Sequence, residues 1–248
     1  MTELLPQRHE IEADGLVSEL PLALRNLHLR LIVNERIKCS LNPNCEEQWN
    51  FQRAVDLVIG AGFEVTNAVV AKSGKITFDL IRIRSLPDTI SANMTLLIVG
   101  LNPSPYSADH SIGYARPGNR FWPAALSAKI VSKNRDPIHA LHVHGLGMTD
   151  LVRRVTRRAA ELSQDELLSG FGRIERQIAW LRPKVVCFMG LSGWRAVANR
   201  NSVAGLQSKP LGGRPVYLMP NPSGLNAHSK LEDFVRHFQK IAEFSKQI

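Results

Sequence analysis

The sequence lacks several features that mark whole classes of protein. It has no apolar run of 18 residues, the length that a membrane-spanning helix needs. Its three cysteines form no Cys-x-x-Cys pair, which argues against a disulfide framework or a zinc site, and they are too few for a four-cysteine iron–sulfur cluster. The opening stretch MTELLPQRHE has acids where a signal peptide would be basic and then apolar. We therefore expect a cytoplasmic chain that needs no membrane, metal or cofactor.

Acidic residues are scarce in the C-terminal part of the chain. Residues 1–90 hold 10 Lys and Arg against 12 Asp and Glu, a net charge of −2, whereas residues 91–248 hold 21 against 10, a net charge of +11. Lys and Arg gain free energy on a polyanion by releasing the counterions condensed on its phosphates. The basic part therefore favours a nucleic-acid partner, although a basic charge alone does not identify one.

Residues 1–90 read as a small α+β appendage. A loose acidic tail precedes a helix from about Ser18 to Lys38, and a second helix covers Phe51 to Ile59. Two alternating runs, FEVTNAVVA and ITFDLIRIR, are joined by Lys-Ser-Gly-Lys and predict a hairpin. The stretch SLPDTISANM then predicts a linker to a second domain over residues 91–248.

From Thr95 onward, strands alternate with helices. The runs TLLIVG, KVVCFMG and PVYLMP are too continuously apolar for half-exposed strands and suit a parallel sheet covered on both faces. Apolar residues recur at helical spacing over residues 167–181 and 231–241. This pattern predicts an α/β fold, a three-layer α/β/α domain with a mainly parallel central sheet. Such sheets bind ligands at the carboxyl ends of their strands.

The tripeptide Asn-Pro-Ser follows such a strand twice, beginning at Asn102 and at Asn221. Both asparagines should therefore lie at the ligand-binding edge, where they could face one cleft. The amide of Asn102 can accept a hydrogen bond from water and donate others, although an asparagine in a turn often only shapes the loop. Tyr114, in the following loop, is placed to stack on a planar ring, whereas Phe121 and Trp122 are predicted to lie in the core.

Four motifs follow one another along the chain: Gly-Leu-Asn-Pro, Tyr-Ala-Arg-Pro-Gly-Asn-Arg-Phe-Trp, Gly-Met-Thr-Asp-Leu and Asn-Pro-Ser-Gly-Leu-Asn. In this order they closely resemble the mismatch-specific uracil-DNA glycosylase and thymine-DNA glycosylase family, and the resemblance spans about residues 95–243. It implies a uracil-DNA glycosylase-like fold and an enzyme that flips uracil out of mismatched double-stranded DNA. Such an enzyme hydrolyses the N-glycosidic bond and leaves an abasic site. We expect it to act as a cofactor-free monomer associated with the nucleoid.

The resemblance also implies roles at the matching positions. Asn102 would position the attacking water, and Tyr114 would stack on the flipped base. The base and sugar pocket would comprise Leu101, Tyr114 and Asn221, and the wedge that enters the duplex would comprise Gly224, Leu225 and Asn226. From their charge or position we add four candidate phosphate contacts: Ser104, Arg153, Arg154 and His228.

The chain departs from the family pattern at two positions. Asp150 stands where many members have Lys, and two interpretations remain open: a base or water positioner in the site, or a salt-bridge partner of the arginines that follow. Those arginines, Arg153, Arg154, Arg157 and Arg158, form the densest basic cluster and suit either phosphate contact or a solvated face. Ala227 stands where the wedge commonly ends in Arg, so recognition of the opposite guanine is expected to differ.

Two other functions fit parts of the pattern. A catalytically weak or inert protein could bind damaged DNA on the same fold, and a hydrolase of free nucleosides could use a similar sheet. The basic charge and Leu225 on its loop favour a polymer substrate over a free nucleoside. The sequence leaves open which further bases are accepted and what residues 1–90 do.

Overall fold

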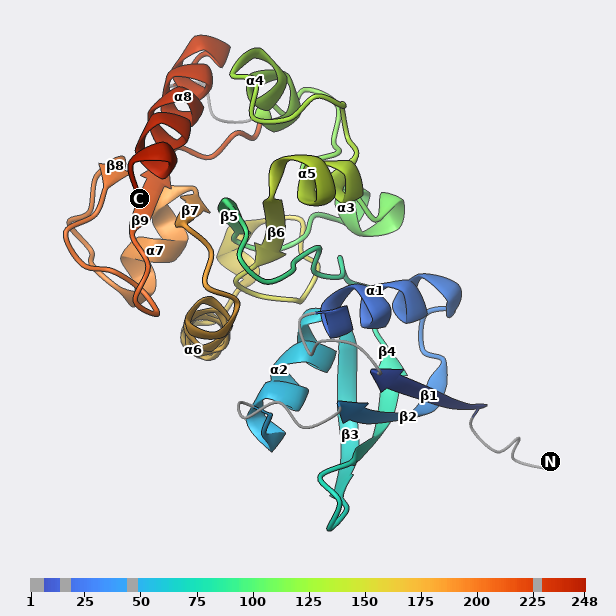
Figure 1. Cartoon of the computed structure of the whole chain (residues 1–248). Coiled ribbons are helices and arrows are strands. Elements are labelled where there is room, and N and C mark those ends of the chain that lie inside the picture. Colours follow the sequence, from blue (N-terminus) through green and yellow to red (C-terminus); the bar gives the residue numbers. More distant parts are fainter. Residues whose placement is uncertain (1–6, 14–18, 44–48, 225–228) are drawn as a thin grey trace. The chain divides into compact units, whose positions relative to one another are not determined.

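The computed structural model describes residues 7–13, 19–43, 49–224 and 229–248 (Figure 1). The chain divides into two compact units, Met1–Asp88 and Thr89–Ile248. The predicted linker SLPDTISANM spans this division. No helix in the described ranges is both long and apolar enough to cross a membrane.

The N-terminal unit is a four-stranded sheet with two helices. Its sheet order is β1-β2-β4-β3, in which β1 runs parallel to β2 and the other pairs are antiparallel. The predicted hairpin is the pair β3 and β4, and the second predicted helix is α2. The elements are β1 (Gln7–Ala13), α1 (Leu20–Arg30), β2 (Arg36–Pro43), α2 (Phe51–Gly60), β3 (Phe63–Val70) and β4 (Ile76–Arg82).

Two predictions for this unit are wrong. Part of the expected loose tail is strand β1, and the helix expected to reach Lys38 ends at Arg30. Leu31 has an extended backbone that ends the helix. At the start of β2, burial alternates from Arg36 to Cys39, with Ile37 and Cys39 buried and Lys38 half-buried. A period of two in burial is the pattern of a strand, which the leucines before it had obscured.

The C-terminal unit holds a five-stranded sheet of order β6-β5-β7-β9-β8 (Figure 1). All neighbouring pairs are parallel except the short edge strand β8 against β9. The elements are β5 (Leu96–Gly100), α3 (Pro105–His110), α4 (Phe121–Ser127), α5 (Pro137–His144), β6 (Leu146–Asp150), η2 (Ala159–Glu161), α6 (Gln164–Leu181), β7 (Val185–Met189), α7 (Leu191–Val197), β8 (Gly205–Leu206), β9 (Val216–Met219) and α8 (Leu231–Gln247).

Helices cover both faces of this sheet, which confirms the predicted α/β class. On one face, side chains of β5, β7 and β9 pack with Phe121 and Trp122 of α4 and Phe238 of α8. On the other face, Phe188 of β7 contacts the rings of Phe171 in α6 and Trp194 in α7. Strands β5, β6, β7 and β9 are buried at every residue, as expected for strands enclosed between two layers.

Strand β6 was not predicted, because its sequence LGMTD includes a glycine and two polar residues. Gly147 is needed there, since a Cβ at this position would lie 2.1 Å from Sδ of Met94. The strand runs parallel to β5 and pairs Asp150 with Gly100. Four parallel strands therefore end at one edge of the sheet, and Asp150 joins the residues that follow β5 and β9 there.

Candidate active site at the carboxyl edge of the sheet

Asn102 lies at the carboxyl end of β5 and is held by the loop that follows β6. Its Nδ2 donates to the hydroxyl of Thr156 over 2.8 Å and to the carbonyl oxygen of Arg154 over 3.0 Å. A weaker contact of 3.4 Å reaches the carbonyl oxygen of Pro103. Because the planar amide directs its N–H groups at these acceptors, Oδ1 points the opposite way. The two shorter contacts are made across more than 50 residues of sequence, so the amide does more than shape a local turn.

Backbone hydrogen bonds fix the same loop to β5. The amides of Leu151 and Val152 donate to the carbonyl oxygens of Gly100 and Leu101, each over 2.9 Å. The amide of Thr156 donates to Pro103 over 3.3 Å. The loop after β6 therefore runs alongside residues 100–103 and is hydrogen-bonded to them on both sides of Asn102.

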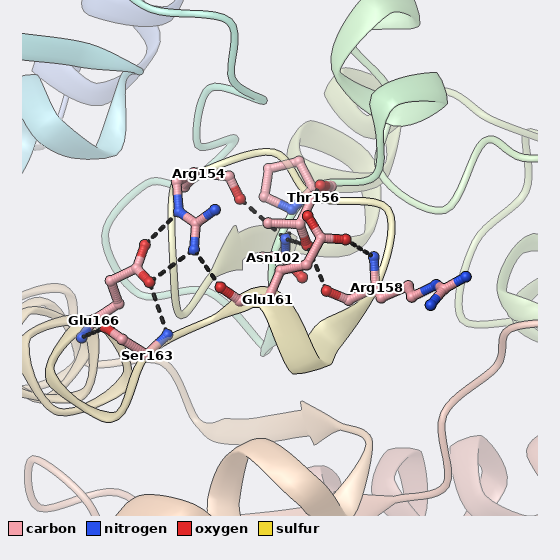
Figure 2. A network of polar contacts seen from close by, with 8 residues as sticks. Asn102, Arg154, Thr156, Arg158, Glu161, Ser163 and Glu166 are labelled. Atoms are coloured by element: carbon pink, nitrogen blue, oxygen red, sulfur yellow. Dashed lines mark hydrogen bonds and ion pairs between the residues drawn. The ribbon is translucent and has the colours of Figure 1, made fainter.

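Arg154 is engaged in an ion pair (Figure 2). Its Nε lies 2.6 Å from Oε1 of Glu166, its Nη2 lies 2.9 Å from Oε2, and Nη2 also donates to the carbonyl oxygen of Glu161 over 2.6 Å. The hydrogen bond from Arg154, with a further one from the amide of Ser163, lowers the pKa of Glu166 to about 2. The side chain of Arg154 thus joins the loop after β6 to the first turn of α6.

Asp150 and Tyr114 converge above Gly100. A Cβ built on Gly100 would lie 2.1 Å from Oδ1 of Asp150 and 3.0 Å from Oη of Tyr114, so both atoms pack against this glycine. Asp150 is buried, and its carbonyl oxygen accepts a hydrogen bond of 2.6 Å from Arg173. Asp150 is the last residue of β6 and pairs with Gly100, which precedes Asn102 by two residues.

Tyr114 is half-buried and adopts a left-handed backbone, with φ of +59°. One face of its ring stacks on Phe121, with centroids 4.4 Å apart and planes inclined by 16°. Its hydroxyl is buried, and no described residue forms a hydrogen bond with it. Burial raises the pKa of Tyr114 well above its usual value, and the negative charge of Asp150 raises it further, so the phenol stays protonated.

Asn221 stands at the end of β9, separated from β5 by β7. Its Oδ1 accepts a hydrogen bond of 2.9 Å from the amide of Ser223, which forms an Asx-turn. Gly190, directly after β7, packs beside it, since a Cβ there would lie 3.5 Å from Cβ of Asn221. The two asparagines therefore share one edge, as predicted, but make different local contacts.

Arg120 fastens the second Asn-Pro-Ser segment and was not singled out from the sequence. Its amide donates to the carbonyl oxygen of Pro222 over 3.0 Å, and its guanidinium donates to the carbonyl oxygens of Ser223 and Ser229. The guanidinium also lies over the ring of Phe234, 5.2 Å from its centroid. Thr156 was likewise missed, because a single Thr between arginines carries no signal in sequence.

The remaining predicted residues have varied surroundings. The hydroxyl of Ser104 caps α3 by accepting from the amide of Ser107 over 3.2 Å, and Arg153 is buried. Gly224 is exposed, and a Cβ there would lie 3.0 Å from the carbonyl oxygen of Gly118. Four residues of the predicted wedge and its flank lie outside the described residues: Leu225, Asn226, Ala227 and His228. Their roles stay predictions, as do the phosphate contacts of Ser104, Arg153 and Arg154.

The described residues contain no group of three His, Cys, Asp or Glu side chains placed to hold a metal ion. The chemistry available at the edge is that of an amide with an acceptor oxygen, a buried carboxylate and an aromatic ring. Asn102 supplies an acceptor, Asp150 a negative charge and Tyr114 a planar surface. These groups suit hydrolysis at a polar bond of a substrate with a flat ring.

Comparison with known proteins identifies a family. The family model described as the uracil DNA glycosylase superfamily matches residues 87–244, more than half of the chain. Among solved structures, the chain is similar to the solution NMR structure of a candidate uracil DNA glycosylase from Methanosarcina acetivorans. The two share 19% sequence identity with a TM-score of 0.44, over 64% of this chain and 98% of that one.

Proposed function

Because the chain belongs to the uracil DNA glycosylase superfamily, we propose that it is a monofunctional DNA glycosylase that removes uracil from mispaired double-stranded DNA. The enzyme extrudes the uracil nucleotide and hydrolyses its N-glycosidic bond, which leaves an abasic site. A mispaired uracil costs less to extrude than a paired base, which favours G·U as the substrate.

The orientation of Asn102 carries this proposal. Its N–H groups are directed at Thr156 and Arg154, so Oδ1 is the atom left to accept a hydrogen bond from a water molecule. Asn102 has no titratable group and therefore acts by holding this water in line with C1′ of the deoxyribose. The half-buried position of the side chain limits the number of orientations that the water can take.

Asp150 supplies the negative charge that the reaction needs. As the N-glycosidic bond breaks, its electron pair leaves with uracil as an anion, and positive charge develops on the sugar. The buried carboxylate stabilises this charge, and it accepts a proton as the water oxygen bonds to C1′. The proton held by Asp150 then passes to the uracil anion, directly or through solvent, so the carboxylate is restored and the products are free uracil and an abasic site.

Tyr114 provides the surface for the extruded base. Its ring stacks on Phe121 with one face, and uracil stacks on the opposite face. Stacking of a base on an aromatic side chain contributes about 1 to 3 kcal/mol. Leu101 and Asn221 complete the pocket around the base and sugar, and the segment from Gly224 to Asn226 acts as the wedge in the duplex.

Single-turnover cleavage of a labelled duplex with one G·U pair tests this function. Wild type, Asn102→Ala and Asp150→Asn are compared by alkaline scission of the abasic product, with Asn67→Ala as the matched control. Asn67 is an exposed asparagine of the N-terminal unit whose amide binds Asp79. We expect Asn102→Ala to lose about a hundredfold or more in rate while Asn67→Ala keeps the wild-type rate.

The same experiment separates the enzyme from a binding protein. If the wild type leaves G·U and other damaged pairs intact yet binds the duplex, the catalytic proposal fails and the chain is a damaged-DNA-binding protein. If Asn102→Ala cuts as fast as the wild type, another group holds the water.

A further inference from the structure

The four arginines after β6 have different surroundings. Arg153 is buried, and Arg154 is occupied by Glu166 and by the carbonyl oxygen of Glu161. Arg157 and Arg158 are exposed, and no described residue forms a hydrogen bond or ion pair with either guanidinium. Only these two arginines of the cluster combine an exposed side chain with a charge that the fold leaves uncommitted.

The backbone of Arg158 is fixed relative to Asn102. The hydroxyl of Thr156, which accepts from Asn102, donates to the carbonyl oxygen of Arg158 over 3.0 Å. The amide of Arg158 donates to Oε1 of Glu161 over 2.8 Å. Two hydrogen bonds thus separate the water-binding amide from the residue that carries this charge.

The side chain of Arg158 points away from the network that holds Asn102 (Figure 2). It extends from the loop that follows β6, at the edge where Asn102 and Asn221 lie. A nucleotide whose sugar is placed over Asn102 brings its own flanking phosphates to this edge. A guanidinium matches the geometry of a phosphate and can bind it through two parallel hydrogen bonds.

We propose that Arg157 and Arg158 bind the backbone phosphates of the strand that carries the extruded nucleotide, while Arg154 acts as a positioning residue for Asn102. This inference rests on the proposed function, since it takes the same strand of DNA as its ligand. The ligand class is the deoxyribose-phosphate backbone, recognised through its charge and without regard to base sequence.

The salt dependence of DNA binding tests whether Arg157 and Arg158, but not Arg154, bind phosphate. Binding of the full chain to a duplex containing a tetrahydrofuran abasic-site analogue is measured between 50 and 300 mM salt. Each phosphate contact adds about 0.9 to the slope of log K against log salt concentration. We therefore expect the double variant Arg157→Ala/Arg158→Ala to lose about 1.8 from the slope, and Arg157→Lys/Arg158→Lys to keep the wild-type value.

Two further variants separate the roles. Arg182→Asn removes an exposed charge at the other end of α6, and asparagine tolerates its left-handed backbone, so the slope should not change. Arg154→Ala should keep the slope within about 0.3 of wild type but lower the single-turnover rate at saturating protein by about tenfold or more. Melting temperatures of all variants confirm that each one is folded.

The outcomes are distinguishable from those of the proposed function. An unchanged slope in the double alanine variant, or the same loss with Arg182→Asn, would overturn the phosphate assignment even if uracil is cleaved. If Arg154→Ala lowers the slope as much as the double variant, Arg154 itself binds phosphate. If no uracil is cleaved but the slope still falls by about 1.8, the phosphate assignment stands without the glycosylase.

Discussion

Asn102 and Thr156 are joined by a hydrogen bond of 2.8 Å across 54 residues of sequence. The Thr156 hydroxyl donates its proton to the carbonyl oxygen of Arg158, so toward Asn102 it can only accept a hydrogen bond. Asn102 must therefore turn its NH₂ group toward it and its oxygen away. The orientation of the Asn102 amide, the proposed water-binding group, is therefore set by Thr156 in the loop that follows β6.

Thr156→Val should lower the single-turnover rate on G·U duplex by about tenfold or more, because the amide of Asn102 loses its best acceptor and can rotate. The two side chains have nearly the same shape, so the change removes the hydroxyl with little change in packing. Thr156→Ser, which keeps the hydroxyl, should retain most of the rate. Equal rates for the valine variant and wild type would show that Arg154 alone orients the amide.

Tyr114→Phe should stabilise the protein against unfolding in urea by about 1 kcal/mol, because a buried hydroxyl without a partner costs free energy. Tyr217→Phe is the matched control, since the Tyr217 hydroxyl forms a 2.8 Å hydrogen bond with His237. That variant should lose about 1 kcal/mol. A loss of stability in both would indicate that a water or another group satisfies Tyr114.

Gly100→Ala should destabilise the protein and reduce cleavage, because its Cβ would overlap the carboxylate of Asp150 at 2.1 Å. The double variant Gly100→Ala/Asp150→Ala should lose less stability than the two single changes added together, because the second change removes the overlapping atoms. Gly172→Ala, within α6 and with no atom closer than 3.4 Å to the new Cβ, should be neutral or stabilising by about 1 kcal/mol. A stable Gly100→Ala enzyme with a normal rate would place Asp150 away from the reaction.

Acid should loosen the loop that holds Asn102. The pKa of Glu166 is lowered to about 2 in the folded protein, so its ion pair with Arg154 contributes stability above the unfolded-state pKa and loses it as the pH falls toward 2. The difference in melting temperature between wild type and Glu166→Gln should therefore shrink between pH 5 and pH 2. Glu175→Gln, on the same helix but away from Arg154, is the control. A constant difference would rule out this linkage.

Much of the C-terminal fold could be predicted because its information is local. The apolar runs of β5, β7 and β9 identify strands buried on both faces, and the edge where parallel strands end predicts where a ligand site lies. Strand β6 escaped notice because its five residues include Gly147, Thr149 and Asp150, although all five are buried at the edge of the sheet beside β5.

The contacts within the site depended on distant parts of the chain. Four arginines within six residues look alike in sequence, yet Arg153 is buried and Arg154 pairs with Glu166. The other two are exposed and have no such partner among the described residues. Which arginine meets a carboxylate is decided by where α6 begins, and that is a property of the folded domain. The same holds for Thr156, whose partner Asn102 is chosen by the pairing of β5 with β6.

The two Asn-Pro-Ser tripeptides have the same sequence, but their asparagine side chains form different hydrogen bonds. The fold engages the nitrogen of Asn102 and the oxygen of Asn221. An aspartate at position 221 would keep the acceptor for the amide of Ser223, whereas at position 102 it would meet the oxygens of Thr156 and Arg154 with no proton to offer. The two copies of the same tripeptide therefore differ in which substitutions preserve their hydrogen bonds.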